Sequence, residues 1–377
     1  MATGPVYPSG DGALNLQSME FGWIRVENRM TDQRWAPSVS ILPDARSALI
    51  AGGFSYSTGG CVSSADIFDE ASGRFQPLKS HLTYPRDFAA ASPLPNGDIL
   101  IAGGYNTELG TLATAEVFRS ASHEFELLDS RMTAGRELFT ATALLNGDIL
   151  ITGGFNIARR QTQTSADLFD PGSMTFKPLD SRMKHSRFGH AAVLLQDGRV
   201  LIVGGKAWRV GHPDKPLASA EIYDPKTQTF SETANEMSAP RDRPTLAQSK
   251  DRKVYVIGGA NGAGGVKAID EFNPLTNAFR DSGLCLTDDR MAHGQFVLSD
   301  DRIAVAGGWS PSQKTTTGSV AILDFPHSLV SSGPPLPESC HDMACVAFAD
   351  GALLSAGGKT IKNGVESSLD TGYFWLP

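Results

Sequence analysis

The chain has 377 residues, of which 41% are hydrophobic, so it can bury a large core. Its net charge of −8 argues against a general nucleic-acid binder, which would carry an excess of basic residues. No apolar run approaches the ~18 residues of a membrane helix, and the first residues do not resemble a signal peptide. Four cysteines are too few for a disulfide scaffold, so we expect a cytoplasmic protein.

Seven pairs of glycines punctuate the chain, and each pair follows an apolar run such as "ILIAGG" or "VLIVGG". Successive pairs are separated by 49 to 54 residues. In most units an arginine lies 17 or 18 residues before the first glycine, and the seventh unit has Cys340 instead. A constant period near fifty residues indicates a repeat architecture. The pairs are Gly52-Gly53, Gly103-Gly104, Gly153-Gly154, Gly204-Gly205, Gly258-Gly259, Gly307-Gly308 and Gly357-Gly358.

Each unit contains the pattern of four short strands. In the fourth unit "HAAVLLQ" and "RVLIVGG" flank Asp197-Gly198, a two-residue turn typical of a β-hairpin. A third strand follows in segments such as "SADIFD", and a fourth begins at a phenylalanine such as Phe75. Four antiparallel strands in seven units predict an all-β, seven-bladed β-propeller. We expect one domain over residues 21–377, preceded by a tail over 1–20.

The two ends of the chain predict how the ring closes. Phe75 lies eleven residues before Arg86, and Trp23 lies eleven residues before Arg34. The segment at Trp23 is therefore expected to be a fourth strand that has no blade ahead of it. The seventh unit ends after its third strand, so the N-terminal strand should complete the last blade and remove its open edge.

These repeats resemble the kelch family, in particular bacterial units similar to those of the galactose oxidase propeller. The resemblance rests on Arg-x-x-His at 187–190 and 290–293, the glycine pairs and the Tyr/Phe-Asp-Pro turns. The family's fourth-strand tryptophan is Phe in five units, which is a tolerable core change. The resemblance does not extend to the copper site of galactose oxidase, because no Tyr-His pair is present and the eight histidines are scattered. We expect no metal and no other cofactor.

A ligand site is predicted at one mouth of the ring. Antiparallel pairing brings the arginines that precede each first strand to the same end as the loops that follow the glycines. A cationic rim of this kind would attract a small anionic molecule or an acidic peptide. For any single arginine we favour a structural role, bonded to carbonyls of the neighbouring blade. The predicted ligand-binding residues are Arg34, Arg86, Arg136, Arg187, Arg241, Arg290, Tyr105, Phe155, Lys206, Trp208, Trp309, His341 and Lys359.

Residues that depart from the repeat are the candidates for chemistry. Glu137 and Asp242 follow arginines and are predicted as general base and acid, with solvated salt bridges as the alternative. His190 and His293 are further catalytic candidates, although they match the family's structural histidine. Asp87 also departs from the repeat.

Two cysteines suggest weaker alternatives. Cys340 and His341 could form a nucleophilic pair, but neighbouring residues on a strand point to opposite faces. Cys61, expected beside blade seven, could approach Cys340 in a redox or metal site.

Two classes of function therefore remain open. One is a monomeric, metal-free enzyme performing acid–base chemistry on a small anionic substrate, such as an isomerisation, cyclisation or lyase step. The alternative is a scaffold that recognises an acidic protein or peptide, as kelch adaptors do; carbohydrate binding is a third possibility. A deep pocket with apolar walls would favour the enzyme, and a wide flat rim would favour the scaffold. Neither nucleic acid nor a membrane is an expected partner.

Overall fold

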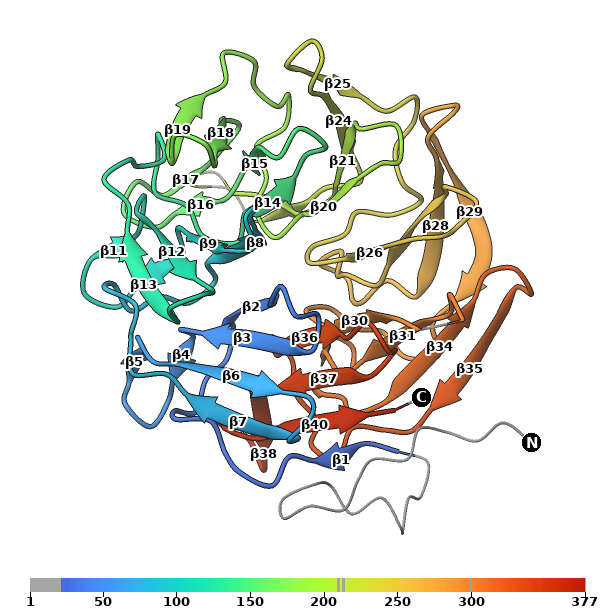
Figure 1. Ribbon diagram of the computed structural model, residues 1–377. Coiled ribbons are helices and arrows are strands. Elements are labelled where there is room, and N and C mark those ends of the chain that lie inside the picture. The colour runs from blue at the N-terminus through green and yellow to red at the C-terminus, as the bar shows by residue number, and fades with distance from the viewer. Residues whose placement is uncertain (1–21, 209–210, 212–213, 299, 377) are drawn as a thin grey trace.

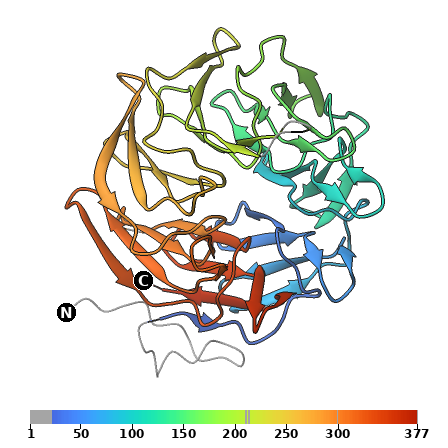
Figure 2. The same ribbon diagram turned by 180° about the vertical axis from the view of Figure 1, so that it is seen from behind.

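The computed structural model describes residues 22–376, except 209–210, 212–213 and 299. Seven four-stranded antiparallel sheets are arranged around a central axis, and the described residues contain no helix (Figure 1). The same ring is seen from behind in Figure 2. The predicted seven-bladed, all-β propeller is therefore confirmed. The tail expected over 1–20 lies outside the described residues.

The strands follow the predicted order within each blade, from the axis outward. Blade one comprises β2 (Ser38–Ile41), β3 (Ser47–Ala51), β6 (Ala65–Asp69) and β7 (Arg74–Pro77), and blade two comprises β8 (Ala90–Pro93), β9 (Ile99–Ala102), β12 (Ala115–Arg119) and β13 (Glu124–Leu127). Blade three comprises β14 (Thr140–Ala143), β15 (Ile149–Thr152), β18 (Ala166–Asp170) and β19 (Thr175–Pro178). Blade four comprises β20 (Ala191–Leu194), β21 (Val200–Val203), β24 (Ala220–Asp224) and β25 (Thr229–Glu232).

Blade five comprises β26 (Thr245–Gln248), β27 (Val254–Ile257), β28 (Ala268–Asn273) and β29 (Ala278–Cys285). Blade six comprises β30 (Gly294–Val297), β31 (Ile303–Ala306), β34 (Val320–Asp324) and β35 (Leu329–Gly333). Blade seven comprises β36 (Ala344–Ala347), β37 (Leu353–Ala356), β40 (Gly372–Trp375) and β1 (Ile24–Arg25). Small hairpins extend the loops after the glycines: β4 (Phe54–Ser55) with β5 (Gly60–Cys61), β10 (Tyr105–Asn106) with β11 (Gly110–Thr111), β16 (Phe155–Asn156) with β17 (Gln161–Thr162), β22 (Lys206–Ala207) with β23 (Lys215–Pro216), β32 (Trp309–Ser310) with β33 (Thr315–Thr316), and β38 (Lys359–Lys362) with β39 (Val365–Ser368).

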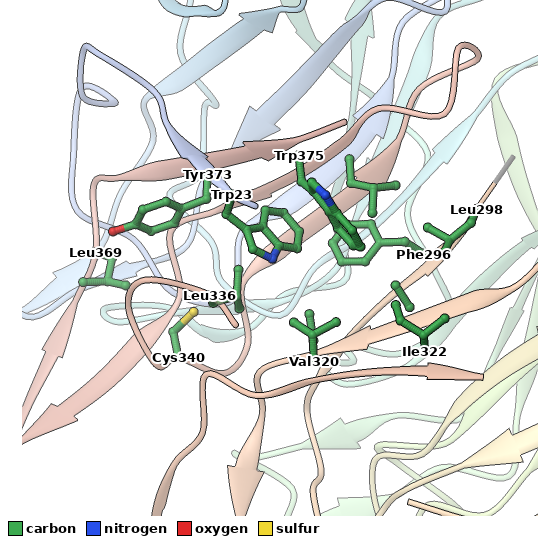
Figure 3. Packing of buried hydrophobic residues seen from close by; sticks show 13 residues of the cluster. Trp23, Phe296, Leu298, Val320, Ile322, Leu336, Cys340, Leu369, Tyr373 and Trp375 are labelled. Atoms are coloured by element: carbon green, nitrogen blue, oxygen red, sulfur yellow. The ribbon is translucent and has the colours of Figure 1, made fainter. Parts of the chain in front are cut away.

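The N-terminal strand closes the ring, as predicted. β1 pairs with β40, so that Ile24 lies opposite Phe374 and Arg25 opposite Tyr373. The Trp23 ring packs 5.4 Å from the Trp375 ring, and its indole N–H donates a hydrogen bond to a backbone carbonyl. Figure 3 shows the Trp23 and Trp375 rings within the apolar cluster that joins blades six and seven.

Aromatic pairs fill the outer part of five blades. The phenylalanine that opens each fourth strand packs against an aromatic ring in the third strand, with ring centroids 4.8–5.5 Å apart. Phe176 against Phe169 is one example. These pairs explain why Phe serves where kelch units carry Trp, because the neighbouring ring supplies the remaining apolar volume.

The glycine pairs allow neighbouring blades to approach closely. A Cβ atom on Gly153 would lie 2.5 Å from the carbonyl oxygen of Arg187 in the next blade, and the φ of Gly153 is +65°. Only glycine fits such an approach without displacing the backbone. The amide of Gly154 then donates a 2.8 Å hydrogen bond to the same carbonyl. Equivalent bonds of 2.8–2.9 Å occur at all seven junctions, and the last runs from Gly358 to Arg34.

The arginine before each first strand is a structural residue of its own blade. Arg136 donates hydrogen bonds to the carbonyls of Gly153 and Ser165 and forms a 2.7 Å ion pair with Asp167. Asp167 in turn accepts a hydrogen bond from Thr133 in the preceding loop. The guanidinium thus joins three segments, but within one blade and not between two as we expected. The same arrangement holds Arg34 to Asp66, Arg86 to Glu116, Arg187 to Glu221 and Arg241 to Asp270.

Replacing Arg136 by Met should destabilise the fold by about 3–5 kcal/mol, because Asp167 would remain buried without its cation. Replacing both residues, as Arg136→Met/Asp167→Leu, should recover a large part of that loss. Urea unfolding followed by tryptophan fluorescence measures both effects. The control Arg131→Met changes an exposed arginine of the same blade. Equal stability of Arg136→Met and Arg131→Met would contradict this role.

Candidate functional site

The six arginines predicted as ligand-binding residues do not line the mouth. Their side chains are 0–1% exposed, and each guanidinium is bonded to carbonyls and hydroxyls of its own blade. A ligand at the mouth cannot reach these groups, so the geometry agrees with the structural alternative. The residues concerned are Arg34, Arg86, Arg136, Arg187, Arg241 and Arg290.

The two histidines considered for catalysis also lie inside the molecule. His190 contacts Thr140 through Nε2 at 3.0 Å, and His293 contacts Thr245 at 2.8 Å. Burial and nearby arginines lower the pKa of each imidazole to about 3. Both rings are therefore neutral at physiological pH, and His190 also borders the axial cavity. Their burial and their hydrogen bonds to threonines favour the structural alternative for His190 and His293.

An outer ring of residues surrounds the mouth. The residue after each arginine, or after Cys340 in unit seven, forms a backbone bridge with the residue after a glycine pair. The two sets of segments therefore meet at one end of the bore, as their antiparallel order predicted. The bridged pairs are Trp35–Phe54, Asp87–Tyr105, Glu137–Phe155, Phe188–Lys206, Asp242–Ala260, Met291–Trp309 and His341–Lys359. Trp208 lies beside this ring, 5.7 Å from the Phe155 ring.

An inner ring follows one residue further along each segment. Its members are Ala36, Phe88, Leu138, Gly189, Arg243, Ala292 and Asp342, and all have φ between 47° and 62°. Backbone hydrogen bonds join neighbouring members, for example from the Arg243 amide to the Gly189 carbonyl at 2.8 Å. This conformation is unfavourable for residues with a Cβ, so the surrounding ring must enforce it. Six members of the inner ring, all except Ala36, border an axial cavity of about 190 Å³.

Arg243 crosses the bore. Its guanidinium forms a 3.0 Å ion pair with Asp342 of blade seven and lies 4.9 Å from the Phe88 ring of blade two. His341 contacts the same carboxylate at 2.8 Å. Burial alone would raise the pKa of Asp342, but Arg243 and His341 outweigh burial and hold this pKa below its usual value. Asp342 is therefore a carboxylate at neutral pH.

Two other carboxyls at the mouth are buried without a partner. Asp87 is 4% exposed and Glu137 is 6% exposed. Among the described residues no side chain donates a hydrogen bond to either carboxyl, and Oδ1 of Asp87 is buried without any partner. Burial raises the pKa of Asp87 to about 8, and Glu137 and Asp342 add to the shift. Burial also raises the pKa of Glu137 to about 7, although Arg243 opposes the shift.

Asp242, the other predicted catalytic carboxyl, is already paired. The ammonium of Lys206 lies 3.4 Å from Asp242 and 2.9 Å from Asp214. Burial raises the pKa of Asp242, and Lys206 is the main opposing influence. The unpaired carboxyl beside Glu137 is thus Asp87, which the sequence marked only as a departure from the repeat.

The cysteines form no common site. Cys340 is buried in the core of blades six and seven, where burial raises the pKa of its thiol to about 12. The thiol of Cys61 donates to the carbonyl of Tyr105 in blade two, so Cys61 faces away from blade seven. The expected approach of Cys61 to Cys340 is therefore wrong. No group of three or more histidine, cysteine, aspartate or glutamate residues suited to a metal occurs within the described ranges.

A larger cavity of about 450 Å³ lies on the opposite face, between the hairpin turns of blades three and four. It is bordered by Leu144, Leu145 and Arg199, and Arg199 is paired with Asp197 at 2.7 Å. The cavity brings together no unpaired buried carboxyls. The axial mouth is therefore the better candidate for chemistry.

The fold and the repeats define the chain as a seven-bladed kelch-type β-propeller. Residues 187–235 match the Kelch motif family model. A segment of 87 residues is 30% identical to the spermatocyte protein spe-26 of Caenorhabditis elegans, covering 23% of this chain and 15% of that protein. A segment of 64 residues is 36% identical to Kelch-like protein 7 of Rattus norvegicus, covering 17% of this chain and 11% of that protein. This chain thus aligns with under one fifth of the length of either relative.

A solved structure supports the fold over most of the chain. A fungal alcohol oxidase of the AA5 family, in complex with copper, superposes with a TM-score of 0.71 over 95% of this chain and 77% of its own. The sequence identity of 17% shows a shared fold alone. The expected kelch repeats are confirmed, whereas a bacterial origin is not indicated by these matches. No described segment forms a helix long and apolar enough to cross a membrane.

The raised pKa values of Asp87 and Glu137 predict a pH-dependent stability. Unfolded carboxyls titrate near pH 4, so these groups contribute stability below pH 4 that is lost as pH rises through 7 to 8. Between pH 5 and 8.5 the free energy of unfolding should fall by on the order of 6 kcal/mol more in the wild type than in Asp87→Asn/Glu137→Gln. Urea titrations at a series of pH values measure the difference. Parallel curves for the two proteins would contradict it.

Proposed function

We propose that the axial mouth binds a small ligand and that Asp87 and Glu137 transfer protons to and from it. The observation that carries this proposal is a pair of buried, unpartnered carboxyls whose pKa values lie near 8 and 7. A general acid and a general base work best when their pKa values lie near the operating pH. Two neighbouring carboxyls with different environments are a recurrent arrangement for this purpose.

The proposed reaction gives different parts to the groups at the mouth. Glu137 has the lower pKa of the two unpaired carboxyls, so it serves as the base, and protonated Asp87 serves as the acid. Arg243 provides a positive charge in the same space, which favours the ionised form of Glu137. Phe88 and Leu138 provide an apolar wall to the cavity. An isomerisation, cyclisation or lyase reaction needs no more than these elements.

The charge of the mouth favours a different ligand from the anion that the sequence suggested. That expectation rested on a cationic rim, but six of its arginines are buried. The remaining cations Lys206 and Lys359 are paired with carboxylates, Lys359 with Glu366 at 2.7 Å. Among the described residues buried at the mouth, the ionisable groups without a partner side chain are the carboxyls of Asp87 and Glu137.

An interaction scaffold is the second candidate function. The segmental similarity to Kelch-like protein 7 supports this alternative. Apolar side chains are also exposed on the loops after the glycines of three consecutive blades. Tyr56 is 37%, Leu109 61% and Ile157 43% exposed. A partner protein or peptide would cover these tips.

Conversion of small metabolites tests the enzymatic proposal. The purified protein is incubated with a protein-free extract of metabolites, and mass spectrometry follows compounds that disappear and appear. The wild type should convert at least one compound, and Glu137→Gln should slow that conversion at least about 100-fold, because the base is lost. Glu124→Gln, an exposed carboxyl on β13, is the matched control and should retain full conversion. Conversion by Glu137→Gln at the wild-type rate would refute the role of Glu137.

A further inference from the structure

Three cations at the mouth are held in the same way, each by an aromatic ring and a carboxylate. Lys206 lies 5.1 Å from the Phe188 ring and 2.9 Å from Asp214. Lys359 lies 5.3 Å from the Trp35 ring and 2.7 Å from Glu366.

Arg243 completes this set between Phe88 and Asp342, as described above. A ring face and a carboxylate together bind a cation better than either group alone, because each supplies negative potential from a different side.

Blades two and three contain the same two components without a cation. Asp87 is bridged to Tyr105, and Glu137 is bridged to Phe155. Bridged residues place their side chains next to each other, as Phe188 and its bridge partner Lys206 show by direct contact. Both carboxyls are buried and lack a partner among the described residues, and each is adjacent to a half-buried ring. Three sites at the mouth therefore hold a cation. The arc formed by Asp87, Tyr105, Glu137 and Phe155 holds none among the described residues.

We propose that the arc formed by Asp87, Glu137, Tyr105 and Phe155 binds an organic cation that carries an amine or a guanidine group. This inference rests on the proposed ligand site and specifies the class of its ligand. The cationic group occupies the space between the two carboxyls and faces the rings. The axial cavity of about 190 Å³ has Phe88 and Leu138 in its wall and accepts a short apolar chain attached to that group.

The charges around the arc disfavour an anion. A ligand entering the arc meets Asp87 and Glu137 directly and the ionised Asp342 nearby, whose charge is felt at Asp87. Arg243 is the opposing cation, but its guanidinium is committed to Asp342 and Phe88. A carboxylate or phosphate would therefore oppose the ionisation of both carboxyls. A cation favours their ionised forms and pairs with them.

Calorimetric titration with four-carbon probes tests the charge of the ligand. Butylguanidinium and butylammonium should bind saturably, whereas 1-butanol and butyrate should bind at least about tenfold more weakly. Asp87→Asn and Glu137→Gln should each weaken butylguanidinium binding at least about tenfold, and Glu124→Gln should leave it unchanged. Thermal melting verifies that the variants are folded.

Three results would overturn the cation site. They are a preference for butyrate, equal binding of butylguanidinium by the wild type and both mouth variants, and no saturable binding at about 10 mM. Different results would refute the proposed function. Cation binding that depends on Asp87, without Glu137-dependent metabolite conversion, supports the cation site and refutes catalysis. Conversion of a compound that has no basic group, without cation binding, supports catalysis and refutes the cation site.

Discussion

The ring depends on a buried arginine that stands at the entrance of six of its seven blades. Its guanidinium holds the glycine end of one strand, the start of the next strand and a carboxylate, all within one blade. Its main-chain carbonyl accepts the amide of the second glycine of the preceding unit, so the same residue also fastens blade to blade. Unit seven lacks both charges, because Cys340 replaces the arginine and Tyr373 replaces the carboxylate. In unit six Arg290 stays buried although Ala321 stands at the carboxylate position, and its ion pair is with Asp288 of the preceding loop at 3.5 Å.

The arginine holds the blade together, so the side chains at the two positions that follow it are free to vary. Backbone bridges and left-handed backbone conformations fix the place of those residues in every blade, whatever side chain they carry. The outer positions range from Trp35 to Asp87, and the inner ones from Gly189 to Arg243. These two positions place fourteen residues at the mouth on a nearly uniform backbone. The chemistry of the mouth is set by side chains from different blades that meet only when the ring is closed.

Much of the architecture was predictable because it is local and repeated. The spacing of the glycine pairs predicted the number of blades. The sequence separation between Trp23 and Arg34 predicted that β1 closes the ring. The burial of the arginines was not predictable from their spacing, since spacing does not say which way a side chain points. Their partners were visible as acidic residues that recur in buried third strands, such as Asp66 and Glu116. Asp87 and Glu137 come close together at a junction between units fifty residues apart, and no local pattern encodes that proximity.

The pairing of β1 with β40 also has a consequence for biosynthesis. About 350 residues separate the two strands, so a ribosome working at 5–20 residues per second needs roughly 20–70 s between making one and the other. Throughout that interval β1 has no partner strand, and the apolar cluster that receives Trp23 is incomplete. Six blades must stack on one another while their terminal faces are still uncovered. The nascent chain is therefore most exposed to aggregation, and most in need of a chaperone, immediately before its last strand is made.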